Sequence, residues 1–219
     1  MEKKQAERAL VYKVLATFSQ TSSFVFPLEV VEDEKPDFQF HMANLQIGAE
    51  CTMAISELFA RVYFLREKYY PDSNIDLSYV HWGALDLTRD EILKLLKKWR
   101  TRLTGPPFFG NIIEKYWSNT IWDCISAKTK RLNAIDYKRR QLNWLLINDN
   151  VHPRTGLSYD IALFILSSFL NSYFLNRAHQ SITFDSVFIK TKDNFVVYDK
   201  NGMSSTPINN LWQQVNAEN

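Results

Sequence analysis

The segment that most constrains the fold is the apolar run Trp144-Leu145-Leu146-Ile147, which ends in the turn signal Asn148-Asp149-Asn150. A strand that is apolar at every position is typical of one buried on both faces of a sheet. Helix-patterned segments and further β-prone segments precede and follow it along the chain. This order predicts an α/β fold with a mixed central β-sheet flanked by helices, in a single domain over residues 1–219.

The spacing of apolar residues predicts the elements around that run. In chain order they are a helix at 2–19, a strand at 24–31, a hairpin at 36–53, helices at 54–70, from 88 onward and at 112–132, the strand at 144–147, a helix at 158–176, and strands at 182–190 and 194–198. Thr88-Arg89-Asp90-Glu91 has the pattern of a capping box, with Thr88 as the N-cap. The tail from Asn201 is expected to be irregular, with one short helix at its end.

Composition excludes several classes of protein. Hydrophobic residues make up 46% and charged residues 23% of the chain, as in an ordinary globular protein. Two cysteines, Cys51 and Cys124, are too few for a disulfide scaffold. The apolar stretch 161–175 is shorter than the roughly 20 residues of a membrane span and is interrupted by Ser and Asn. We therefore expect a cytoplasmic protein with no membrane partner and with reduced thiols.

Charge is concentrated in the middle of the chain. Residues 89–140 hold 13 Lys and Arg against 5 Asp and Glu, a net charge of +8. Clustered basic residues are typical of polyanion binding, although a solvated helix face gives the same pattern. We expect a basic helical insertion at about 71–110. The candidate nucleic-acid-binding residues are Lys94, Lys97, Lys98, Arg100, Lys130 and Arg131.

The predicted hairpin brings two carboxylates together. If Ala43 and Asn44 are the central turn residues, Asp37 lies opposite Glu50, and directly opposite side chains are about 5 Å apart. Facing carboxylates repel each other unless a cation neutralises them, and Mg²⁺ or Mn²⁺ would do so. The same register adds Lys35 and Thr52 to this face. The alternative is an exposed hairpin face with ordinary charges.

A resemblance to a known family rests on these residues. Pro36-Asp37, followed after twelve residues by Glu50-Cys51-Thr52, resembles the bipartite motif of the PD-(D/E)XK nuclease-like superfamily. The same segment resembles uncharacterised bacterial proteins that are suspected members. The resemblance implies a restriction-endonuclease-like fold in which the Asp and the Glu sit on adjacent strands and bind Mg²⁺. It also implies Glu7, on the first helix, as a further acidic ligand.

The sequence departs from this motif at Thr52, because the family has a Lys two residues after the Glu. A hydroxyl cannot carry the positive charge that the family's Lys supplies. Lys35 on the facing strand or Lys128 on the helix at 112–132 is expected to replace it. Lys128 lies on the apolar stripe of its helix, which fits either a site residue or a snorkelling side chain with a solvated head.

These observations predict a metal-dependent nuclease that hydrolyses the phosphodiester bonds of DNA or RNA, with DNA favoured. The catalytic candidates are Asp37, Glu50, Lys128, Lys35 and Thr52, and the metal ligands are Asp37, Glu50 and Glu7. Cutting two strands favours two sites, which suggests a homodimer. The alternative is a catalytically degenerate nuclease-like fold that binds nucleic acid or acts in protein interaction, for example as an immunity or assembly factor.

Overall fold

The computed structural model describes residues 3–19, 26–73, 75, 87–100, 110–151, 156–175 and 182–209. Parts of the expected insertion at 71–110, the start of the strand expected at 24–31 and the expected terminal helix lie outside these residues. The described elements are α1 (Lys3–Phe18), β1 (Glu29–Glu32), β2 (Phe38–Met42), β3 (Leu45–Ala54), α2 (Glu57–Tyr69), α3 (Arg89–Trp99), α4 (Ile112–Leu132), β4 (Leu142–Asp149), α5 (Tyr159–Leu175), β5 (Ser186–Lys190), β6 (Asn194–Asp199) and β7 (Gly202–Pro207).

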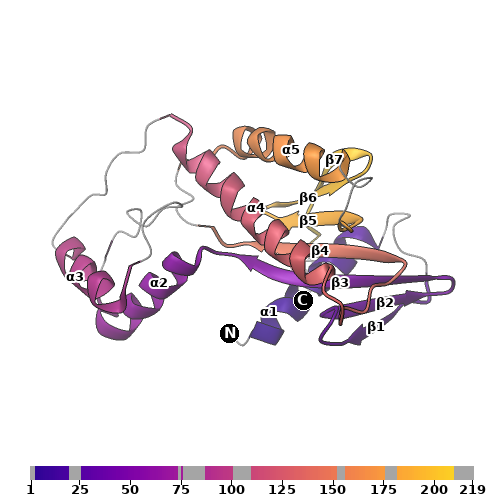
Figure 1. The fold of residues 1–219 in the computed structure, drawn as a ribbon, viewed down its shortest axis with the longest axis horizontal. Helices are drawn as coiled ribbons and strands as arrows, with labels where there is room; N and C mark the ends of the chain where they lie inside the picture. The colour runs from indigo at the N-terminus through magenta and orange to yellow at the C-terminus, as the bar shows by residue number, and fades with distance from the viewer. Residues whose placement is uncertain are drawn as a thin grey trace, which may run out of the picture. The chain divides into compact units, whose positions relative to one another are not determined.

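The seven strands form one mixed sheet in the order β1-β2-β3-β4-β5-β6-β7 (Figure 1). Antiparallel pairing joins β1 to β2 and β2 to β3, and again β5 to β6 and β6 to β7. Strands β4 and β5 are parallel, with α5 between them in the chain. The predicted α/β class with a mixed central sheet is therefore confirmed.

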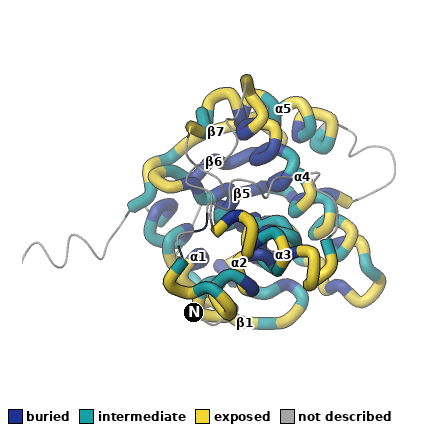
Figure 2. Tube along the Cα trace, turned by 90° about the vertical axis from the view of Figure 1, so that its left-hand side faces the viewer, coloured by how far each residue is buried: buried dark blue, intermediate teal, exposed yellow. Residues whose placement is uncertain are grey.

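Helices α1 and α4 cover opposite faces of this sheet (Figure 1). Ile47, Ala49 and Cys51 of β3 share a hydrophobic cluster with α1, whereas Glu50 between them meets Lys128 of α4. Successive side chains of a strand point to opposite faces, which explains this division. Residues of β4, β5 and β6 complete the cluster, and Figure 2 shows β5 and β6 as buried.

The chain divides into two compact units by spatial proximity. The first holds 1–53, 123–149 and 167–219, and the second holds 54–122 and 150–166. The second unit has its own core from α2 and α3, including Phe59, Val62, Ile92, Leu96 and Trp99. The expectation of a single domain with a helical insertion stays a prediction.

Two local expectations have different outcomes. The capping box at the start of α3 is confirmed, because Thr88 accepts a hydrogen bond from the Glu91 N–H and the Glu91 carboxylate accepts one from the Thr88 N–H. The expectation of an irregular tail from Asn201 is wrong for 202–207, which form β7. The sequence of β7 has no alternation of apolar and polar residues, and the strand is almost wholly exposed. It is recognised as a strand only by its hydrogen-bonded pairing with β6.

Among the helices that the structure describes, none is both long enough and apolar enough to cross a lipid bilayer.

Gly48 permits the close approach of the β1–β2 connection to β3. A Cβ at this position would lie 2.9 Å from Pro36 Cγ and 3.3 Å from Arg140 Cγ. We expect Gly48→Ala to lower the free energy of unfolding by about 1–3 kcal/mol, because the proline ring beside Asp37 must move. Urea denaturation measures this loss. It should shrink in a Pro36→Ala background, and an unchanged loss there would show that the contact with Pro36 is not its cause.

Candidate functional site

The hairpin register places Asp37 and Glu50 side by side. The paired residues run from Met42 and Leu45 to Phe38 and Ala49, so Asp37, one residue before β2, lies opposite Glu50. This is the register that the sequence predicts. Both side chains are shielded from solvent, at 12% exposure for Asp37 and 0% for Glu50. The structure therefore holds two carboxylates together in a poorly solvated place.

Lys128 of α4 supplies the positive charge between them. Its Nζ atom lies 2.6 Å from Glu50 Oε2 and 3.6 Å from Asp37 Oδ2. The Lys128 side chain is itself only 16% exposed, so its ammonium group is turned away from water and toward the carboxylates. Lys35 and Lys128 are the two lysines expected to replace the Lys of the motif, and Lys128 is the one that contacts both carboxylates.

The neighbouring backbone and α4 fix the two carboxylates. The Cys51 N–H donates to Asp37 Oδ2 at 2.8 Å, which ties Asp37 to β3 beyond the last paired residues of β2. Arg131, one turn after Lys128, lies 3.7 Å from Glu50 Oε2 through one terminal nitrogen. Its other terminal nitrogen donates to the Glu34 carbonyl at 2.7 Å. Arg131 therefore bridges α4 and the β1–β2 connection.

Burial sets the protonation properties of the site. It raises the pKa of Glu50, with Asp37 adding to the rise, while the charges of Lys128 and Arg131 oppose it. Burial also raises the pKa of the Tyr137 hydroxyl, and the negative charge of Glu50 adds to that effect. Among the described residues, Glu50 Oε1 and the Tyr137 hydroxyl are buried and make no hydrogen bond of good geometry, although the Tyr137 hydroxyl is close enough to Glu50 to interact with it as a donor. The site thus contains a buried carboxylate oxygen and a buried hydroxyl that interact without a well-formed hydrogen bond.

These residues fit a divalent cation. Lys128 pairs with Oε2 of Glu50, whereas Oε1 is buried and makes no well-formed hydrogen bond, so a cation beside it would offset the cost of its burial. No group of three or more His, Cys, Asp or Glu side chains in the described part of the chain is placed to hold a metal ion. Mg²⁺ nevertheless is held in many sites by one or two carboxylates with water and substrate phosphate. Asp37 and Glu50 supply two carboxylates of this kind.

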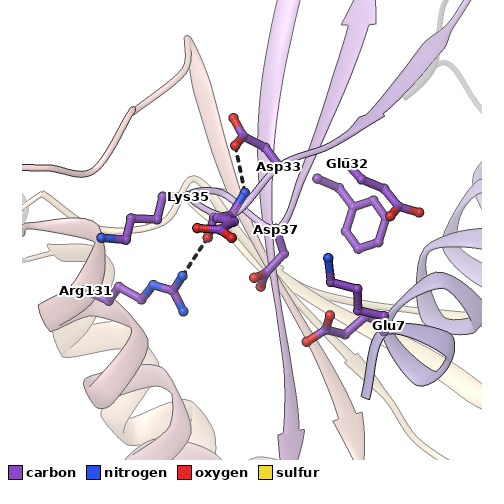
Figure 3. Close-up of a pocket in the computed structure, with 9 residues that line it drawn as sticks. Glu7, Glu32, Asp33, Lys35, Asp37 and Arg131 are labelled. Atoms are coloured by element: carbon purple, nitrogen blue, oxygen red, sulfur yellow. Dashed lines mark hydrogen bonds between the residues drawn. The ribbon is translucent and has the colours of Figure 1, made fainter. Parts of the chain in front are cut away.

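A hollow of 240 Å³ is lined by Asp37, Lys35 and Arg131 (Figure 3). The fully buried Glu50 does not line it. Figure 3 shows Asp37 between Arg131 of α4 and Glu7 of α1, with Glu32 and Asp33 at the rim. Glu7, expected as a further metal ligand, lines this hollow and does not form a three-residue cluster with Asp37 and Glu50.

The other catalytic candidates lie differently. The Lys35 ammonium forms an ion pair with Asp136 and makes none with Asp37 or Glu50. Lys35 is also 43% exposed, so it is a surface residue. Thr52 is half-buried and lines a second cavity, which Lys128 also lines. The structure therefore pairs Lys128 with Asp37 and Glu50, whereas Lys35 lines the hollow beside Asp37 and forms its ion pair with Asp136.

The basic candidates fall into two groups. Arg131 is half-buried at the carboxylates, although the sequence suggested only a role in nucleic-acid binding. The others are exposed, four of them on or just after α3 in the second unit: Lys94, Lys97, Lys98, Arg100 and Lys130. Tyr116 and Trp117, two aromatic residues of α4, are buried at 4% and 1% exposure and are core residues. An exposed basic face on α3 is thus present, and its ligand stays a prediction.

Sequence reasoning missed Tyr137 and assigned Arg131 only to nucleic-acid binding. Tyr137 follows α4 and is buried, with a hydroxyl that Glu50 affects electrostatically. No motif marks Tyr137, since it approaches Glu50 only through the tertiary fold. The contact of Arg131 with Glu50 had a usable signal, because Lys128 and Arg131 are three residues apart and share one face of α4.

Comparisons of the chain with family models, with curated proteins and with solved structures each gave no match.

We predict that Glu50 makes stability depend on pH in the metal-free protein. Its pKa is higher in the folded than in the unfolded state, so its contribution is fully present below the unfolded value and is lost as pH rises through the folded value. The Tm difference between wild type and Glu50→Gln should therefore become less favourable to wild type from about pH 4 upward, as thermal unfolding in EDTA would show. Glu57→Gln, at an exposed position of α2, is the control. A Glu50→Gln difference as flat as the control's would contradict the prediction.

We also predict that Lys128→Met destabilises the protein at pH 7 by about 3 kcal/mol, because removing one partner leaves buried charge uncompensated. The retained Arg131 keeps the loss at the lower end of the usual range. Lys130→Met, at an exposed position of the same helix, should change stability by less than about 0.5 kcal/mol. Urea denaturation compares the two. Equal effects would show that Lys128 is an ordinary surface lysine.

Proposed function

We propose that this protein is a Mg²⁺- or Mn²⁺-dependent phosphodiester hydrolase that acts on nucleic acid. The observation that carries the proposal is the meeting of Lys128 with Asp37 and Glu50, at 3.6 and 2.6 Å. Lys128, on α4, supplies the positive charge that the Thr52 hydroxyl cannot provide. Metal-assisted hydrolysis of a phosphodiester uses carboxylates to hold the cation and a positive charge to stabilise the phosphate, and this poorly solvated site contains both.

The order of elements supports the proposed family. Helix α1, the meander β1-β2-β3, helix α4 and strand β4 occur in this order, with α2 and α3 between β3 and α4, and all four strands belong to one sheet. This is the order that the resemblance to the PD-(D/E)XK nuclease-like superfamily implies. Asp37 at the start of β2 and Glu50 on β3 lie on adjacent strands, as the motif requires. We therefore propose a restriction-endonuclease-like core.

Each residue has a distinct role in the proposed reaction. When bound, the divalent cation would lower the pKa of a water molecule and neutralise charge on the phosphate. Asp37 and Glu50 would hold it, with Asp37 oriented by the Cys51 N–H and Glu50 by Arg131. The Lys128 ammonium group stabilises negative charge that develops on the phosphate oxygens. The exposed basic residues of α3 are proposed to hold the phosphate backbone.

A second candidate function follows from how closely Lys128 pairs with Glu50. A 2.6 Å contact to a fully buried carboxylate is a stable ion pair without any metal. Such a site would support a catalytically degenerate member of the same fold that binds nucleic acid through its basic residues. Metal-dependent cleavage separates the two functions, because only the hydrolase cuts the strand.

We expect calorimetric titration to show Mn²⁺ binding to wild type, together with Mn²⁺-dependent cleavage of DNA or RNA oligonucleotides. Asp37→Asn should lose both, because it removes one of two carboxylates. Asp72→Asn, at an exposed position in the second unit, should retain both.

Binding without cleavage in wild type would favour the degenerate fold. Undiminished cleavage by Asp37→Asn would contradict the proposed site.

A further inference from the structure

A second cavity, of 460 Å³, is lined by Glu7 and by Lys128. It is formed by α1, the end of β3, Asn148 of β4 and Lys128 of α4, all within the first unit. Glu7 lines both cavities. Its volume is within the range of roughly 300–1,000 Å³ that is usual for small-molecule sites. The proposed reaction centre therefore has a pocket of ligand size directly beside it.

The walls of this cavity combine apolar side chains with a few polar ones. Ala6 and Leu10 of α1 and Met53 of β3 give apolar surface. Thr52 and Asn148 contribute polar side chains, and neither makes a side-chain hydrogen bond with any described residue. A methionine sulfur packs well against an aromatic ring, and a carboxamide can both donate and accept hydrogen bonds. Apolar walls with such polar groups suit a flat heteroaromatic ring with a polar edge.

We infer that this cavity holds a single unpaired nucleobase of the strand being cut, an inference that rests on the proposed function. Lys128 lines the cavity and also contacts the two carboxylates, so a base in the cavity and its phosphate at the carboxylates would belong to adjacent parts of one nucleotide chain. The substrate class is therefore single-stranded or locally unpaired nucleic acid.

The charge of the cavity favours a neutral ring over an anionic group. Glu7 is at its edge, and Glu50 lies behind Lys128, so a phosphate placed inside would meet carboxylates. A nucleobase carries no charge at neutral pH and has hydrogen-bonding groups for Asn148 and Thr52. A base in a duplex would first have to leave its stack, at a cost of a few kcal/mol. We therefore expect single strands to be cut faster than duplexes.

The inference is tested with a substitution on α1 that fills the cavity with a larger side chain. Ala6→Trp places an indole in the cavity, whereas Ala9→Trp makes the same change at an exposed position of the same helix that does not line it. The probe is 2-aminopurine deoxyriboside, a neutral fluorescent nucleoside that needs no metal to offset the carboxylates. We expect saturable binding to wild type and Ala9→Trp in EDTA, and a Kd at least about tenfold higher for Ala6→Trp. Equal Kd values for all three, or no saturable binding to wild type, would overturn the inference.

Cleavage with Mn²⁺ separates this inference from the proposed function. If only Ala6→Trp loses cleavage of a single-stranded oligonucleotide while its Mn²⁺ affinity is retained, both are supported. If all three proteins cleave it equally, the hydrolase stands and the base pocket is wrong. If no protein cleaves but Ala6→Trp alone fails to bind the nucleoside, the pocket stands and the hydrolase is wrong.

Discussion

The ion pair between Lys128 and Glu50 is the interaction on which the candidate site depends. A fully buried carboxylate is costly unless a positive charge compensates it, and here the charge comes from a helix 78 residues away in the chain. Because the Lys128 ammonium also approaches Asp37, it joins the hairpin to α4 at one point. The surrounding packing, with α1 on the other face of the sheet, holds that point in place.

The site contains a buried carboxylate whose burial is only partly compensated by its positive neighbours. The raised pKa of Glu50 means that burial outweighs the help it receives from Lys128 and Arg131. Its second oxygen and the nearby Tyr137 hydroxyl make no well-formed hydrogen bond among the described residues. Natural proteins retain such unsatisfied buried groups mainly where they serve a function, since each one costs stability. A cation beside Glu50 would relieve this cost, which is why the unsatisfied groups support a binding site.

Local patterns predicted the hairpin but not the residues that complete it. The turn at Ala43 and Asn44 fixed the register, and with it the approach of Asp37 to Glu50, because side chains alternate strictly along a strand. The choice between Lys35 and Lys128 could not be made in this way, since it depends on where α4 crosses the sheet. Tyr137 carried no signal at all, as its position near Glu50 arises from tertiary packing alone.

We propose that Asp37 and Glu50 hold a divalent cation beside Lys128. Anomalous diffraction from crystals soaked in Mn²⁺ tests it most directly, because it locates the ion without relying on turnover. The account predicts an anomalous peak within coordination distance of Glu50 Oε1 and the Asp37 carboxylate, with Lys128 still paired to Glu50 Oε2. Crystals at saturating Mn²⁺ with no peak there, or with a peak only at other surface carboxylates, would contradict it.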